Sequence, residues 1–152
     1  MRCGSGLHAG SGIALLLLGV LVLSAMPASA EDLTLVERAS SDTVTDLGAK
    51  GDSVGDLLTF ANDLFDAGNA TKAGTDNGSC VRTAAGKAWE CAWTNTLAKG
   101  QINVAGTFLD GADSVLAVTG GTGEYAGARG EMGLHARDAQ GSAYDFKFKI
   151  SR

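Results

Sequence analysis

The stretch SVLAVTGGTGEYAGARGEMGLHAR, residues 114–137, decides how this chain is expected to fold. An apolar run over 115–118 leads into a segment with five glycines in eleven residues: Gly120, Gly121, Gly123, Gly127 and Gly130. Glycines that follow a strand can cradle a phosphate group, and they can also serve turns that need positive φ or a close approach of two backbones. The two possibilities imply different proteins.

The glycine spacing argues against a phosphate-binding loop. A dinucleotide fingerprint requires Gly-x-Gly-x-x-Gly between a strand and a helix, near the start of a βαβ unit. Residues 121–127 read Gly-x-Gly-x-x-x-Gly, no Lys-Ser/Thr follows as in a P-loop, and 130–137 alternates apolar and polar residues like a strand. The stretch therefore predicts a wide turn between two adjacent strands.

The rest of the chain is also rich in strand signals. Short segments with β-branched and aromatic residues are separated by turn residues. The segment 57–66 is also compatible with an amphipathic helix, and 39–55 is expected to be a long loop. Eight short strands with tight turns predict an all-β domain, either a closed antiparallel barrel or a sandwich. We expect strands over 33–38, 56–65, 78–84, 89–97, 101–109, 114–120, 130–137 and 143–150.

Residues 1–30 have the pattern of a cleaved secretory signal peptide. Arg2 precedes an apolar run over 13–23, and the sequence PASA at 27–30 offers a cleavage site. The apolar run is shorter than the ~20 residues that a membrane-spanning helix needs, so a retained anchor is the less favoured alternative. We expect a secreted, extracytoplasmic protein with no membrane span after cleavage and one domain over 31–152.

Charge and metal-ligand content exclude two classes of function. The chain has a formal charge of −5, and loss of Arg2 makes the expected domain more acidic still. An acidic chain lacks the basic face that nucleic-acid binding requires, so no nucleic-acid partner is expected. The domain keeps a single histidine, His135, and two cysteines, whereas zinc requires three or four ligands at recognisable spacing. We expect no metal.

The two cysteines of the domain flank a predicted hairpin. The segment CVRTAAGKAWEC, residues 80–91, has its turn at Ala85 and Gly86. Counting outward from the turn brings Cys80 opposite Cys91, at a distance that fits a disulfide. We predict this disulfide. The alternative is a reactive thiol, for which Arg82 is the nearby positive group.

Several segments together resemble one known family. TGGTGEYAGARGEM (119–132) resembles the Gly-Gly-(Thr/Ser)-Gly-aromatic-x-x-Ala-x-Gly signature of the allene oxide cyclase barrel and its dirigent-protein relatives. GDLLTFANDLFDAG (55–68), SCV (79–81) and GQINVAGTFL (100–109) are similar to further segments of the family, so that the resemblance covers about 51–150. It implies a single eight-stranded antiparallel β-barrel, often trimeric, whose apolar cavity takes an oxylipin or a phenolic radical without a cofactor.

The resemblance also implies site residues. It places Asn62 and Cys80 in the cavity wall as catalytic candidates. It places Thr34 and Val36 where the family has a glutamate and a second asparagine on its first strand. Glu37 is adjacent, but a shift of one residue turns a side chain to the other face of a strand.

Alternation along the strands extends this cavity wall. Side chains two residues apart on a strand share a face. If Cys80 faces the cavity, the residues two positions from it on its own strand, and the residues opposite these on the next strand, face the cavity too. The same holds for the residues two positions from Asn62 on its strand. This set predicts an aromatic-lined ligand pocket, and the alternative is ordinary core packing. The ligand-binding candidates are Phe60, Asn62, Leu64, Arg82, Trp89 and Trp93.

Two further groups of residues have open interpretations. Glu131, His135 and Arg137 share the polar face of one expected strand, as an acid–base cluster or as a solvated outer face. Asn69 and Asn77 begin Asn-x-Ser/Thr sequons, which are glycosylation acceptors in some hosts and otherwise turn residues.

Together these features predict a secreted allene oxide cyclase-like or dirigent-like barrel that binds an apolar, oxylipin- or phenolic-like molecule. If it is an enzyme, we expect a cofactor-independent isomerase or cyclase. The alternatives are a non-catalytic lipocalin-like carrier and a structural barrel for protein or surface interaction. A buried polar cluster around Asn62 would favour the enzyme, a cavity without such a cluster the carrier, and a filled barrel the structural role.

Overall fold

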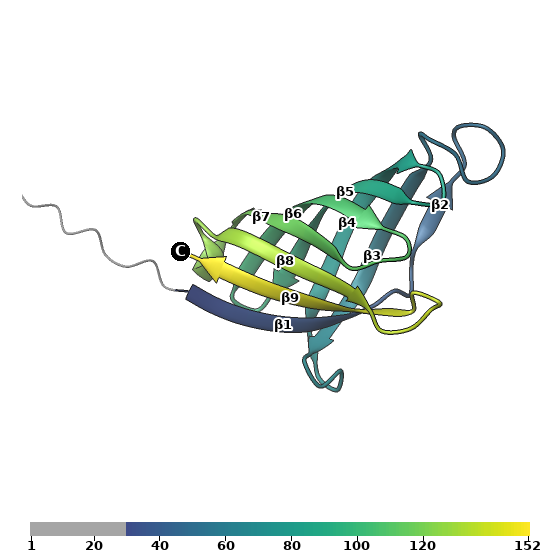
Figure 1. Ribbon diagram of the computed structural model, residues 1–152. Coiled ribbons are helices and arrows are strands. Elements are labelled where there is room, and N and C mark those ends of the chain that lie inside the picture. The colour runs from purple at the N-terminus through teal and green to yellow at the C-terminus, as the bar shows by residue number, and fades with distance from the viewer. Residues whose placement is uncertain (1–29) are drawn as a thin grey trace, which may run out of the picture.

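The computed structural model describes residues 30–152, and the predicted signal peptide lies outside these residues except for Ala30. Each of the expected strands is present, and 57–66 is a strand, so the helical alternative for that segment is wrong. The expected loop over 39–55 contains one short strand, β2. The elements are β1 (Ala30–Arg38), β2 (Thr43–Thr45), β3 (Leu57–Asp66), β4 (Lys72–Ala84), β5 (Ala88–Leu97), β6 (Gly100–Leu109), β7 (Ser114–Gly121), the 3₁₀ turn η1 (Gly123–Tyr125), β8 (Arg129–Ala136) and β9 (Ala143–Ser151) (Figure 1).

The strands form a closed barrel. Strands β3 to β9 pair consecutively in antiparallel fashion. β9 also pairs with β1, and β1 pairs with β3 to close the sheet. The result is an eight-stranded antiparallel barrel with β2 added beside β3, which confirms the barrel prediction. The pairing of Leu35–Arg38 in β1 with β3 closes the barrel and reduces the free strand edge that could pair with another chain. Among residues 30–152, no helix is long and apolar enough to cross a membrane.

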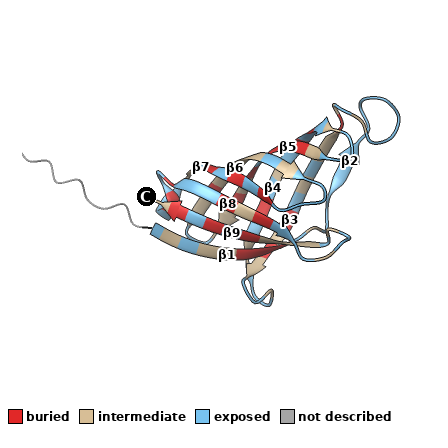
Figure 2. Cartoon of the chain, viewed as in Figure 1, coloured by how far each residue is buried: buried red, intermediate tan, exposed pale blue. Residues whose placement is uncertain are grey.

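Buried and exposed residues alternate along the strands (Figure 2), because successive side chains of a strand point to opposite faces. In β9, Phe146 and Phe148 are buried while Lys147 and Lys149 are exposed. The barrel interior is mostly apolar, and burying this apolar surface is the main driving force for folding. A row of polar side chains from four neighbouring strands interrupts it: Glu37, Asn62, Asp76 and Asn95.

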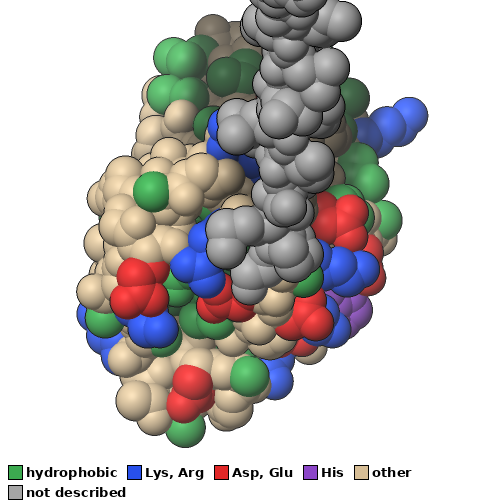
Figure 3. All heavy atoms as spheres, turned by 90° about the vertical axis from the view of Figure 1, so that its left-hand side faces the viewer, with side chains coloured by type: hydrophobic (Ala, Val, Ile, Leu, Met, Phe, Trp, Pro, Cys, Tyr) green, Lys and Arg blue, Asp and Glu red, His purple; other side chains and the backbone are tan. Residues whose placement is uncertain are grey.

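The glycine-rich stretch is the connection between β7 and β8, as predicted. It contains η1, and Tyr125 from this connection is buried in the core. The backbone N–H of Glu124 donates to the carbonyl of Lys99 in the β5–β6 turn at 2.9 Å. The stretch therefore covers the end of the barrel at which β1 begins and β9 ends (Figure 1). Figure 3 views this end and shows acidic and basic side chains intermixed around it.

One glycine of this stretch leads to a stability prediction. Gly130 has φ +139°, and a Cβ there would lie 2.0 Å from the carbonyl oxygen of Lys149 in β9. We expect Gly130→Ala to lower the free energy of unfolding by about 2 to 4 kcal/mol in urea denaturation, because the β8–β9 backbone must shift. Gly111→Ala is the control, since a Cβ at Gly111 meets nothing within 4 Å. Equal losses in the two variants would contradict the prediction.

Candidate functional site

A pocket enters the barrel at the end opposite the glycine-rich connection. Its free volume is about 40 Å³, which is room for about three water molecules. Aromatic rings fill the space around it: Trp93 packs against Phe60 and Phe146, with ring centroids 5.9 and 5.7 Å apart. A ring-shaped ligand therefore requires some lining side chains to rotate outward. The lining residues are Glu37, Asp42, Leu58, Phe60, Cys80, Cys91, Trp93, Phe108, Leu134, Tyr144 and Phe146.

Asn62 organises the carboxylates of this pocket. Its Nδ2 donates to Glu37 Oε1 at 2.9 Å and to Asp42 Oδ1 at 2.8 Å. Its Oδ1 accepts the backbone N–H groups of Ser40 and Ser41 at 2.9 and 3.0 Å. Both N–H donors and both acceptor lone pairs of the amide are thus used. In this structure Asn62 fixes Glu37 and the β1–β2 connection and has no free group to offer a ligand.

Glu37 and Asp76 form a buried carboxyl pair. Glu37 is 6% exposed and Asp76 is 0% exposed. The two carboxyl groups are hydrogen-bonding partners, and the backbone N–H of Asn62 also interacts with the Asp76 carboxyl. Burial and the neighbouring Glu37 raise the pKa of Asp76 to about 9, and burial also raises the pKa of Glu37. Near neutral pH the pair therefore holds a proton that the two carboxyl groups share.

The position of Glu37 corrects the expectation for the first strand. Glu37 lies inside the barrel against Asn62 and Leu35 belongs to the core cluster, whereas Val36, although fully buried, lies outside that cluster. By alternation Thr34 and Val36 point away from the interior, so the polar group on β1 is Glu37. The signal that could have identified it is the alternation Leu33-x-Leu35-x-Glu37 in the sequence.

The predicted disulfide is confirmed. Cys80 and Cys91 are directly opposed on β4 and β5 and are bonded to each other. Both line the pocket, so Cys80 contributes an apolar wall and, while the bond is intact, no free thiol. Nearer the turn the pairing differs from the count made on the sequence, because the register shifts and Ala84 opposes Ala88.

The disulfide predicts a redox dependence of stability. It closes a short loop, with a sequence separation of 11. In the chain-entropy account we expect reduction, or Cys80→Ala with Cys91→Ala, to lower the free energy of unfolding by about 2 to 3 kcal/mol. Urea denaturation with and without a reductant measures this, and the double variant is the control because the reductant should leave it unchanged. A wild-type curve insensitive to full reduction would contradict the prediction.

The ligand-binding candidates occupy different depths of the barrel. Phe60 and Trp93 line the pocket, whereas Leu64 is fully buried in the core. Arg82 and Trp89 point inward but are not part of the pocket lining; they lie in a network at the rim. The Arg82 guanidinium stacks 3.8 Å above the Trp89 ring.

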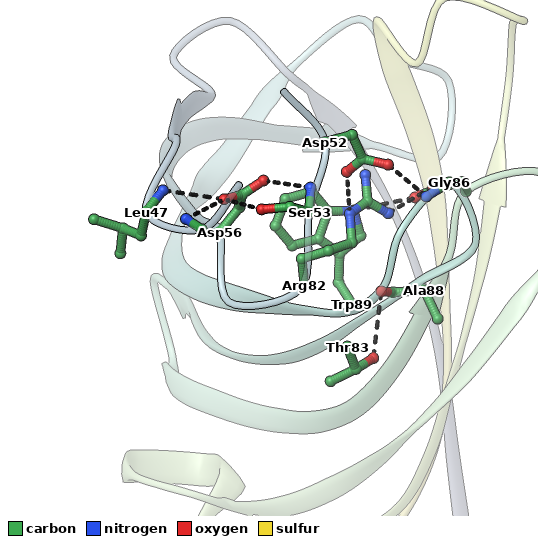
Figure 4. Close-up of polar contacts among 11 residues, drawn as sticks. Leu47, Asp52, Ser53, Asp56, Arg82, Thr83, Gly86, Ala88 and Trp89 are labelled. Carbon is green, nitrogen blue, oxygen red and sulfur yellow. Dashed lines mark hydrogen bonds and ion pairs between the residues drawn. The ribbon is translucent and has the colours of Figure 1, made fainter. Parts of the chain in front are cut away.

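The rim network joins two loops, and Figure 4 shows its contact between Asp52 and Arg82. Arg82 forms ion pairs with Asp52, from the connection between β2 and β3, and with Asp110, from the β6–β7 turn, each at 2.6 Å. The indole N–H of Trp89 also donates to Asp110 at 3.0 Å. Asp56 accepts backbone N–H groups from the same β2–β3 connection, and the hydrogen bond from Ser53 is the main cause of its lowered pKa. These contacts hold the connection in place.

The remaining sequence candidates are on the outside. Glu131, His135 and Arg137 are exposed and pair with three different residues: Lys149 at 3.2 Å, Asp113 at 2.6 Å and Asp145 at 3.4 Å. They do not form one cluster. Asn69 lies in the β3–β4 turn, and Asn77 is an exposed residue within β4. In the part of the chain that the structure describes, no three His, Cys, Asp or Glu side chains form a metal-binding group.

Comparisons with known proteins agree with this architecture. A pyocyanin demethylase structure is 27% identical, with a TM-score of 0.67 over 79% of this chain and 99% of that chain. A pterocarpan synthase dirigent protein is 11% identical, with a TM-score of 0.69 over 88% and 99% of the two chains. A Diels-Alderase from Streptomyces koyangensis is 14% identical, with a TM-score of 0.65 over 83% and 69%. The sequence model described as allene oxide cyclase matches residues 31–139, and the chain belongs to this family.

Proposed function

We propose that the protein binds a flat, apolar small molecule at the mouth of the barrel and rearranges it by proton transfer, as a cofactor-independent isomerase or cyclase. The observation that carries the proposal is the Glu37–Asp76 pair, one member of which lines an aromatic pocket. A carboxylate whose pKa is raised by burial is a stronger base than a solvated one. The polar cluster around Asn62 favours this enzyme over a simple carrier.

The arrangement divides the chemistry among three residues. Glu37 accepts a proton from a C–H or N–H group of the bound molecule, and the bond's electron pair stays in that molecule to form the new double bond. Asn62 and Asp76 orient the Glu37 carboxylate, and its remaining lone pairs receive the proton. Return of a proton to a second atom of the molecule completes the isomerisation, and Asp76 keeps the pair supplied with one proton. General acid–base catalysis of this kind contributes about 10²- to 10⁴-fold in rate.

The relatives support a reaction on a small molecule. Two solved structures of the same fold are named as a pterocarpan synthase dirigent protein and a Diels-Alderase, and the one at 27% identity is named as a pyocyanin demethylase. Of the two ligand classes expected from the family resemblance, oxylipin-like and phenolic-like, the proposal keeps the phenolic-like class, because its members are flat. The signal-like segment and the disulfide between Cys80 and Cys91 support action outside the reducing cytoplasm.

A probe reaction tests the proposal without the natural substrate. In the ring opening of 5-nitrobenzisoxazole, a base removes the ring proton, the N–O bond breaks and a coloured phenolate forms. We expect the protein to accelerate this reaction and Glu37→Gln to lower kcat/KM by about 100-fold, because Gln cannot accept the proton. Glu131→Gln, which removes an exposed carboxylate on β8, is the control and should retain full activity. Binding of the probe without ring opening would favour the carrier instead.

A further inference from the structure

A second and wider cavity adjoins the inner pocket. Its volume is about 420 Å³, and it lies between the β6–β7 turn and the β8–β9 turn. Phe108, Leu134 and Tyr144 line both cavities, so the two cavities are adjacent and share this wall. The rings of Phe108 and Tyr144 meet edge to face with centroids 6.0 Å apart. The outer cavity has the size of a small-molecule site, and a ligand bound in both cavities passes these two rings.

The outer cavity is lined by negative charge. Three of its lining residues are Asp110, Asp113 and Asp138, and the inner pocket adds Glu37 and Asp42. Neither lining, both of which fall within residues 30–152, contains a lysine or an arginine. A ligand that occupies both the outer cavity and the inner pocket therefore meets carboxylates in each of them.

The positive groups close to this path are already paired. Arg82 contacts Asp110, but it is balanced by Asp52 as well. His135 lines the outer cavity and lies 2.6 Å from Asp113. A carboxylate on a ligand would therefore find no unpaired cation in either lining, and the low-dielectric walls strengthen its repulsion.

The wall of the inner pocket includes Trp93, which has a buried polar group without a partner among residues 30–152. Trp93 is 5% exposed, and its indole N–H has no acceptor within the described residues. A buried donor without a partner is costly, and an acceptor on a ligand would satisfy it. The inner end of the ligand is thus expected to carry an acceptor, such as a ring nitrogen or a carbonyl.

We infer that the two cavities form one site for a flat ring compound with an acceptor at its inner end and a positive charge or N–H donors at its outer end, and that this site rejects carboxylates. The inference rests on the proposed function, since it names the class of molecule that Glu37 would act on. It departs from the oxylipin expected from the family resemblance, because an oxylipin acid carries a carboxylate.

Three tricyclic probes test the inference: 9-(aminomethyl)acridine, a cation at pH 7 whose ring nitrogen stays unprotonated; acridine, which is neutral; and acridine-9-carboxylate, an anion. Fluorescence titration at low ionic strength should show the cation binding at least about tenfold more tightly than the anion. Salt should reduce this ratio because it screens the carboxylates. Equal or tighter binding of the anion would overturn the inference.

Variants locate the source of the preference. Asp113→Asn with Asp138→Asn should reduce the ratio of cation to anion affinity about fivefold. Asp113→Asn alone should act in the same direction, and it covers the case that Asp138, which accepts two backbone N–H groups of its turn, is needed for folding. Asp32→Asn with Glu124→Gln is the matched control, because it removes the same charge at the other end of the barrel. An equal effect of this control would overturn the assignment to the outer cavity.

A last variant tests the inner end of the proposed ligand site. Trp93→Phe keeps an aromatic wall but removes the N–H, so it should weaken acridine binding about fivefold while the preference for cations remains.

The two proposals fail in different ways. If no acridine binds but Glu37 opens 5-nitrobenzisoxazole, the two-cavity site is wrong and the proposed function stands. If the acridines bind with the expected preference and no ring opening depends on Glu37, the proposed function is wrong and the selective site stands.

Discussion

The free energy of unfolding is expected to fall as the pH rises from about 4 toward about 9. Asp76 has its pKa raised from 3.8 to about 9, chiefly by burial. Between these values the folded protein holds a proton that the unfolded chain has lost, so each rise in pH favours unfolding, with a slope of up to about 1.4 kcal/mol per pH unit for one such group. The raised pKa of Glu37 adds to the same trend. Urea denaturation at a series of pH values measures it.

Asp76→Asn should remove most of this dependence. An asparagine keeps the shape of the protonated carboxyl and cannot ionise, so the variant should be more stable than wild type near pH 8 and less sensitive to pH above 4. Asp32→Asn is the control, because Asp32 is exposed on β1. A wild-type protein that gains stability between pH 5 and pH 8 would contradict the buried carboxyl pair.

The loss of stability that we expect at low pH has a different origin. The pKa values of Asp56, Asp66 and Asp138 are lowered, chiefly by hydrogen bonds to Ser53, Ala70 and Ser142 respectively. A lowered pKa contributes stability that is lost as the pH falls through the folded value, below about 4. The protein should therefore be most stable near pH 4 to 5.

Arg82→Met should cause a large loss of stability, of about 2 to 4 kcal/mol in urea or thermal unfolding. The variant leaves Asp52 and Asp110 facing each other without a cation, and it removes the guanidinium from the Trp89 ring. Breaking a buried ion pair from one side is costly because the remaining charges stay behind. The partial exposure of the two aspartates places the expected loss at the lower end of the usual range.

Two further variants frame this prediction. Arg137→Met removes a more exposed cation from the barrel surface and should cost less than about 1 kcal/mol. Adding Asp52→Asn and Asp110→Asn to Arg82→Met should recover part of the loss, because no charge is then left unpaired. If Arg82→Met alone unfolds like wild type, the rim network contributes nothing to stability.

Local patterns predict most of this fold. Alternation such as that of Phe146 and Phe148 with Lys147 identifies a half-buried strand from the sequence alone. The hairpin count also placed Cys80 opposite Cys91, since pairing near a short turn is a local property. These features depend on few residues that are close in sequence.

The polar site was less predictable, for two physical reasons. The first half of β4, 72–77, is rich in Gly, Asp and Asn, which are typical of turns, so the expected strand began only at 78 and Asp76 was missed. The contact of Asp76 with Glu37 also depends on barrel closure, a long-range pairing that no local pattern encodes. Alternation gave the correct face for Arg82 and Trp89, but it carries no information on depth along the barrel axis.

The glycine-rich connection closes one end of the barrel. Because Tyr125 and its neighbours fill one end of the barrel formed by residues 30–152, the reactant and the product of the proposed isomerisation would both use the opposite end. In the proposed enzyme the two molecules would therefore compete for the same entrance, and release of a tightly bound product would limit the turnover rate. Inhibition by product should accordingly be competitive with the reactant, a kinetic property that follows from glycines which touch neither molecule.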